Sequence, residues 1–228
     1  IVTIAICGKY NSLHDAYKSI LEAFIHSGIE NDAQVRVKWI DTEKLEVMNN
    51  IDEVIKNVDG VLIPGGFGNR GIEGKIMISR YARENGIPFF GICLGLQCAI
   101  IDFARNVCNW EHANSTEFVK KCKSPVIDLM QGQRNVKSKG ATMRLGTYLC
   151  RVRSKTKAYT AYKGRNINER HRHRYELNPA YFEALEKGGM HISGKSPDEK
   201  LAEIVELPKN FIFFRTHVVG FLVPWIVF

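Results

Sequence analysis

The stretch Phe89-Phe90-Gly91-Ile92-Cys93-Leu94-Gly95-Leu96-Gln97 decides the fold, because an apolar run ends at a cysteine with a glycine two residues to either side. This pattern is typical of a nucleophile elbow, in which a strand turns sharply into a helix and glycines stand where the backbone is crowded. We expect Cys93 to be exposed at the turn, where the helix dipole and unpaired N–H groups favour its thiolate. A buried structural cysteine is an equally open interpretation of these nine residues.

Apolar strands and amphipathic helices alternate along the chain up to residue 105. The patterns predict strands over residues 1–7, 34–41, 58–64 and 89–92, and helices from about residue 15 to a stop at Gly28, over 52–57 and over 72–85. The strand over 34–41 alternates apolar and polar residues, which places it near an edge. This order predicts an α/β fold: an open, mostly parallel, doubly wound sheet with helices on both faces and ligands beyond the carboxyl ends of the strands.

The rest of the chain is less regular. Residues 106–176 are rich in Asn, Ser, Lys and Arg and indicate short strands and loops. A helix over 181–187 and closing strands around Ile192, over 202–207 and over 211–214 complete the expected order.

A glycine-rich loop follows the strand over 58–64. Gly66, Gly68 and Gly71 satisfy the dinucleotide fingerprint G-x-G-x-x-G, but the next strand ends at Cys93 instead of at an acidic residue. We therefore interpret the loop as allowing backbone to come close to whatever Cys93 attacks. A dinucleotide-binding domain is the weakest of the alternatives.

Composition favours one globular core. The chain has 228 residues, 45% hydrophobic and 25% charged, which excludes a disordered or fibrous protein. Its six cysteines form no C-x-x-C pair, so neither a zinc site nor a disulfide framework is expected, and reduced cytoplasmic thiols fit best. Residues 1–228 begin inside a strand without a signal peptide, so we expect an excised domain, and the apolar tail from Val218 is too short to span a bilayer.

The formal charge of +8 is concentrated in one segment. From Gln133 to Arg174 there are 13 Lys and Arg residues against one acid, Glu169. This segment can attract a polyanion, but it lacks the interleaved aromatic residues of a nucleic-acid binder, so we expect no nucleic-acid partner. His171 and His173 alternate with arginines, whose charge repels a cation, so we expect no metal site.

Three further blocks narrow the interpretation to a family. They are Asn114-Ser115-Thr116-Glu117-Phe118, Ala141-Thr142-Met143-Arg144-Leu145-Gly146, and the run from Glu169 to Glu176. Together with Gly91 to Gly95 and the Pro-Gly-Gly loop at 64–66, they make the chain resemble the glutaminase (class I glutamine amidotransferase) domain of CTP synthase from about Ile1 to His217.

The resemblance implies a thiolate that attacks the side-chain amide of L-glutamine while N–H groups hold the oxyanion. Cys93 and His217 are then catalytic, and Leu94 forms the oxyanion hole with Gly65 and Gly66. Glu117 binds the α-ammonium group, Arg174 the α-carboxylate, and Phe67 packs over the pocket. Gly65, Leu94, Gly95, Leu96 and Gln97 complete the expected glutamine-binding set. On charge alone, Arg174 reads as part of a solvated basic face.

The sequence departs from the family at its end. The family has a His-Pro-Glu block in which the glutamate orients the imidazole, whereas this chain has His217-Val218-Val219, with Arg215 where the family has glutamine. One interpretation is a real divergence that weakens glutamine hydrolysis without abolishing it, since a few per cent of a cysteine is already thiolate at neutral pH. The other is a sequence artefact at the end of a normal enzyme.

The resemblance also implies partners. This domain needs no cofactor, while ATP and Mg²⁺ serve a missing N-terminal synthetase domain that aminates UTP to CTP, with GTP as an allosteric activator and a homotetramer as the full-length assembly. The basic stretch from Arg134 to Arg174 faces GTP or the partner domain in this hypothesis. The alternatives are an amidotransferase with another acceptor and a non-catalytic binding domain in which Cys93 is structural.

Overall fold

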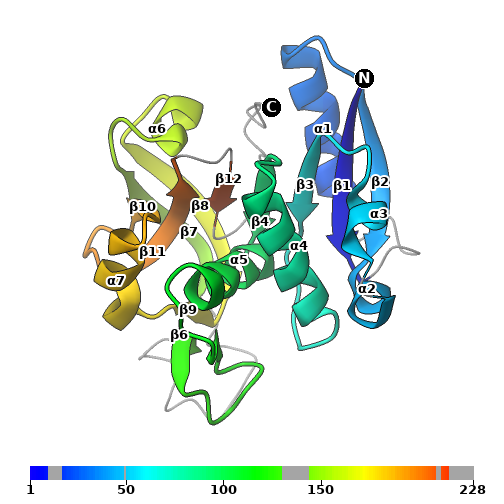
Figure 1. Ribbon diagram of the computed structural model, residues 1–228. Coiled ribbons are helices and arrows are strands. Elements are labelled where there is room, and N and C mark those ends of the chain that lie inside the picture. Colours follow the sequence, from blue (N-terminus) through cyan, green and yellow to red (C-terminus); the bar gives the residue numbers. More distant parts are fainter. Residues whose placement is uncertain (10–16, 49, 130–143, 209–211, 216–228) are drawn as a thin grey trace.

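The computed structural model describes residues 1–9, 17–48, 50–129, 144–208 and 212–215. A large sheet runs through the molecule (Figure 1), and five neighbouring strands form its parallel half. In spatial order these are β2 (Val35–Asp41), β1 (Val2–Gly8), β3 (Gly60–Ile63), β4 (Phe89–Ile92) and β12 (Ile212–Arg215). The α/β class is confirmed, and β2 lies at the edge as its alternation predicts.

Four antiparallel strands extend the sheet beyond β12. They are β11 (Ala202–Leu207), β10 (His191–Lys195), β7 (Arg144–Val152) and β8 (Asn166–His173). The strands expected around Ile192 and over 202–207 correspond to β10 and β11. For residues 106–176 we expected only short strands and loops, which is wrong for β7 and β8, since they pair over eight residues. Their many charged residues hide the strand pattern, because an edge pair with one solvated face tolerates Lys and Arg on that face.

A second sheet of three strands lies beside the first. It contains β5 (Ala113–Ser115), β6 (Ser124–Leu129) and β9 (Tyr175–Leu177). Only Arg174 separates β8 from β9, so the chain changes sheets there and brings both sheets to one place.

Helices cover both faces of the parallel half, as expected. In β1, Ile4 and Ile6 point to one face and pack with α1 (Lys18–Glu30), while Ala5 and Cys7 point to the other face. That second face is covered by α2 (Thr42–Met48), α3 (Ile51–Ile55), α4 (Ile72–Glu84) and α5 (Leu94–Asn106). The remaining helices are α6 (Lys157–Tyr162), the 3₁₀ turn η3 (Pro179–Tyr181) and α7 (Phe182–Lys187).

Gly28 does not stop α1, which continues to Glu30. Its role is close packing: a Cβ at Gly28 would lie 2.4 Å from the carbonyl oxygen of Ala33, whose N–H donates to Gly28 O. In the part of the chain that the structure describes, no helix is long and apolar enough to cross a membrane.

Candidate active site

Cys93 occupies the turn between β4 and α5. Its backbone has φ 52° and ψ −99°, a conformation that an L-residue adopts only under constraint. The flanking glycines make this turn possible: a Cβ at Gly91 would lie 2.7 Å from Leu96 N, and one at Gly95 would lie 2.2 Å from Ile63 O. The strained turn has the geometry of the expected nucleophile elbow.

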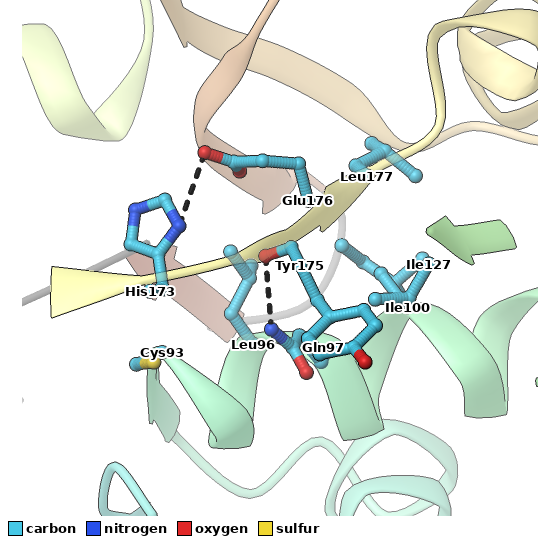
Figure 2. A pocket seen from close by; sticks show the side chains of 9 residues that line it. All are labelled: Cys93, Leu96, Gln97, Ile100, Ile127, His173, Tyr175, Glu176 and Leu177. Atoms are coloured by element: carbon cyan, nitrogen blue, oxygen red, sulfur yellow. Dashed lines mark hydrogen bonds and ion pairs between the residues drawn. The ribbon is translucent and has the colours of Figure 1, made fainter. Parts of the chain in front are cut away.

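The expectation that Cys93 is exposed is wrong, because its residue is only 6% exposed. The chain from His173 to Leu177 forms a roof over it, and the two lie on opposite sides of one pocket (Figure 2). The expected preference for thiolate is also not met. Burial raises the pKa of the Cys93 thiol to about 12, and the carboxylates of Glu176 and Glu117 add to this rise. A hydrogen bond from the backbone N–H of Leu94 opposes it by lowering the pKa.

The pocket is formed by three segments that lie far apart in the sequence. Figure 2 shows α5 below and the β8–β9 segment above. The lining residues are Cys93, Leu96, Gln97, Ile100, Ile127, His173, Tyr175, Glu176 and Leu177. The pocket is therefore apolar toward α5 and β6, and it carries titratable groups around the thiol.

Gln97 joins the two sides of the pocket. Its Nε2 donates to the carbonyl oxygen of Tyr175 at 3.2 Å. Its Oε1 is buried and has no hydrogen-bond partner among the described residues. A buried acceptor without a donor is costly, so Oε1 is suited to receive an N–H group from a ligand.

The glycine loop after β3 lies against the elbow. A Cβ at Gly65 would lie 3.6 Å from Cys93 Cβ, and one at Gly66 would lie 3.2 Å from Leu94 Cδ2. Gly68 donates its N–H to Glu117 Oε1 at 3.2 Å, which draws this carboxylate to the site. Burial raises the pKa of Glu117, while the Gly68 N–H and the charge of Lys9 lower this pKa.

Phe67 does not pack over the pocket in this structure. Its side chain is 53% exposed and it is not among the lining residues, while its carbonyl oxygen accepts from Lys9 Nζ. The loop backbone therefore lies at the elbow, but the phenyl ring points elsewhere.

Arg174 stands between the two sheets, next to Tyr175 of the pocket roof. It is half-buried and forms no hydrogen bond or ion pair with another residue in the described part of the chain. Arg174 is not among the residues that line the pocket, but its half-burial differs from the solvated basic face that charge alone suggests.

His217 lies outside the described residues, as do Val218 and Val219. The strand that precedes them is described. β12 runs parallel to β4 and places Arg215 beside Ile92, which directly precedes Cys93. The end of β12 therefore reaches the edge of the sheet that carries the thiol.

The two histidines of the basic segment are placed differently from the expectation. His171 and His173 are buried on one face of β8. Among the described residues they contact the carboxylates of Glu203 and Glu176 and each other. No group of three or more His, Cys, Asp or Glu able to hold a metal occurs among the described residues.

His173, Tyr175 and Glu176 are pocket residues that sequence reasoning did not assign. The signal that could have found them is the period-two spacing of Glu169, His171 and His173, which predicts a buried polar strand face inside the basic segment.

Comparison with known proteins assigns this site to a family. Residues 12–214 match the family model described as glutamine amidotransferase class-I. The chain belongs to this family. Within it, the glutaminase domain of Trypanosoma brucei CTPS with bound acivicin superposes with a TM-score of 0.90 at 36% identity, over 98% of this chain and 90% of that one. This confirms the expected resemblance to the glutaminase domain of CTP synthase.

Curated relatives give the same assignment. This amidotransferase is 53% identical over 221 residues to a CTP synthase of Methanocaldococcus jannaschii, covering 94% of this chain and 41% of the relative. It is 56% identical over 208 residues to a CTP synthase of Chloroherpeton thalassium, covering 91% and 37%. The chain thus spans about two fifths of the length of these relatives.

Proposed function

We infer that this chain hydrolyses L-glutamine to glutamate and ammonia. The observation that carries the proposal is the strained elbow, which holds Cys93 in a pocket with the unpartnered acceptor Gln97 Oε1, in a member of the class-I glutamine amidotransferases.

The first chemical step is attack of Cys93 Sγ on the side-chain amide carbon of glutamine. The new C–S bond forms, the C–N bond breaks, and the nitrogen leaves as ammonia with the proton of the thiol. Water then cleaves the γ-glutamyl thioester, giving glutamate and the free thiol. In this proposal the N–H of Leu94, with one from Gly65 or Gly66, holds the oxyanion, and losing one such donor typically costs roughly 10²–10³ in rate.

Selectivity for glutamine requires groups for both charges of the amino acid. Glu117 is close enough to act on Cys93 through its charge and takes the α-ammonium in this proposal. Arg174, which has no hydrogen bond or ion pair with another described residue, takes the α-carboxylate. Gln97 Oε1 accepts an N–H of the bound ligand.

His217 is the proposed base for the thiol proton, without the acidic residue that the family uses to orient it. Val219 stands at that position, so we expect slower hydrolysis than in a Val219→Glu variant. Equal rates for the two proteins would show that the acid has no role here.

The proposal extends to a longer protein. We propose that an N-terminal synthetase domain uses ATP and Mg²⁺ to activate UTP, and that ammonia from this domain converts UTP to CTP in a cytoplasmic homotetramer activated by GTP. This rests on curated relatives of more than twice this length that are named CTP synthase. Lys137 and Lys139, which we suggest for GTP, lie outside the described residues.

The test is release of glutamate and ammonia from glutamine by the purified chain, compared with Cys93→Ala. Cys98→Ala is a matched control, because Cys98 is a buried thiol of the same helix that does not line the pocket. We expect activity in the wild type and the control, and none in Cys93→Ala. Hydrolysis that persists in Cys93→Ala would refute the proposal.

A further inference from the structure

Two histidines and two glutamates form a buried chain of polar contacts that ends at the pocket roof. His171 Nδ1 lies 2.8 Å from His173 Nε2. At one end His171 Nε2 is 3.4 Å from Glu203 Oε2, and at the other His173 Nδ1 is 3.2 Å from Glu176 Oε1, the contact drawn in Figure 2. All four residues are 5% exposed or less.

We infer from the geometry how many protons the two rings carry. The two nitrogens that lie 2.8 Å apart share one proton, because they repel each other when both are protonated or when neither is. Each outer nitrogen lies at ion-pair distance from a carboxylate, without the alignment of a hydrogen bond. An ionised carboxylate at that distance is favourable only when the nitrogen carries a proton. Three protons on two imidazoles amount to one positive charge that both rings share.

The groups that the described residues place around the rings favour this single shared charge. Glu203 comes from β11 and Glu176 from β9, so carboxylates face the pair from two elements. From β7, the phenol ring of Tyr148 meets the ring of His171 edge to face at 5.5 Å. From α5, the Cys93 thiol shares the pocket with His173, and on β8 itself Glu169 accepts from Tyr162 Oη.

The contact between His173 and Glu176 joins the two ends of the segment that carries Arg174. His173 precedes Arg174 and Glu176 follows it, and their mutual contact closes the bend at which the chain leaves one sheet for the other. The same bend presents Tyr175 O to Gln97 Nε2. Losing the shared proton leaves a carboxylate facing an unprotonated nitrogen, which opens the bend.

We propose that Glu203, His171, His173 and Glu176 are positioning residues for the glutamine pocket, and that their one shared proton makes glutamine binding weaken as pH rises. The proposal rests on the proposed glutamine site. Glu203 acts at a distance, since it touches His171 and is not among the residues that line the pocket.

The first test observes the protons of the two histidine rings directly and does not depend on glutamine. In ¹H–¹⁵N spectra of the imidazole nitrogens, with single histidine variants for assignment, we expect three ring N–H protons on the His171–His173 pair at neutral pH. Two neutral rings or two full imidazolium rings would overturn the proposal.

The second test measures glutamine affinity by calorimetry from pH 6 to 10 in the Cys93→Ala protein, which cannot turn over. Adding Glu203→Gln removes one carboxylate that stabilises the shared charge, so we expect the loss of affinity to begin roughly 1–3 pH units lower. Glu206→Gln is the matched control: Glu206 is also buried on β11, but it accepts from the N–H groups of Lys157 and Ala158 at the start of α6.

The outcomes separate the two proposals. If the pH at which glutamine affinity falls is lower in Glu203→Gln and unchanged in Glu206→Gln, the positioning role is supported. A merely structural role lowers the thermal stability of both variants and leaves this pH unchanged. An unchanged pH profile in Glu203→Gln overturns the coupling. Absence of glutamine binding at every pH refutes the glutamine site, and the imidazole spectra then still decide whether the proton chain exists.

Discussion

Cys93 combines the strained backbone of a nucleophile elbow with a thiol that keeps its proton. Burial and two carboxylates raise its pKa to about 12 in the ligand-free structure. In our proposal the ammonium group of glutamine neutralises Glu117 when it binds, which removes one of these carboxylate charges. The thiol is then easier to ionise when substrate is present, and this protects it from unwanted reactions when substrate is absent.

Glu117→Gln tests this account. Removing the carboxylate lowers the pKa of Cys93 in the free protein, so we expect alkylation by iodoacetamide at pH 8 to be faster than in the wild type. The KM for glutamine should rise at least about tenfold, since a charge-assisted contact contributes roughly 1.5–3 kcal/mol. Unchanged alkylation, with the alkylated residue identified by peptide mapping, would show that Glu117 does not act on the thiol.

The sequence alone predicts the elbow at Cys93 with Gly91 and Gly95 on either side, because the elbow is a local pattern. It does not predict that Cys93 is buried, since Glu176 and the rest of the roof come from a distant part of the chain. Glu176 follows the basic segment, and only the three-dimensional bend at Arg174 brings it to the thiol.

At the scale of elements, the elbow depends on backbone packed against backbone. A Cβ at Gly95 would lie 2.2 Å from Ile63 O, so α5 and β3 cannot both keep their places around a larger residue. The helices and strands near the elbow can be predicted from the sequence, because each is short and its pattern of apolar residues is local.

Gly95→Ala should lower the free energy of unfolding by about 2 kcal/mol or more, measured by urea denaturation. Gly164→Ala is the control, because a Cβ there would meet its nearest atom, Tyr162 O, only at 3.7 Å. We expect this control to change stability by about 0.5 kcal/mol or less. Equal effects of the two substitutions would contradict the close approach at the elbow.

The features that the sequence did not predict depend on partners far away in the chain, or carry residues whose usual meaning is different. Gly28 is a helix residue that allows Ala33 to approach, so its usual meaning as a stop signal fails. In β8, buried His171 and His173 alternate with exposed positions such as Arg170, and the basic composition conceals the strand.

At the scale of the whole molecule, β12 is the strand that joins the two halves of the large sheet. It pairs in parallel with β4 and antiparallel with β11, so residues 212–215 lie beside the strand that leads into the elbow. Sequence predicts a strand there but not its place, because strand order depends on contacts between residues far apart in the chain.

The core also contains thiols whose ionisation opposes folding. Burial raises the pKa of Cys98 to about 12 from 9.0, and the pKa of Cys7 is raised as well. A raised pKa in the folded state gives stability that is fully present below pH 9 and is lost as pH rises toward 12. Each such thiol should cost about 1.4 kcal/mol of stability between pH 8 and pH 10.

Cys98→Ala should reduce this loss of stability by about 1.4 kcal/mol, measured as the difference between urea unfolding at pH 8 and at pH 10. Ile101→Val serves as control, since it removes a buried methyl group from the same helix without a titratable group. Its cost should be equal at the two pH values. A Cys98→Ala protein with the pH dependence of the wild type would contradict the assignment.

The central claim is that Cys93 is a nucleophile in a pocket shaped for glutamine, and intact mass after incubation with a glutamine-like diazoketone amino acid tests it most directly. We predict one adduct in the wild type and in Cys98→Ala, none in Cys93→Ala, and protection of the wild type by excess glutamine. No adduct in the wild type, or an adduct that persists in Cys93→Ala, would contradict the account and leave this domain a binding module with a structural cysteine.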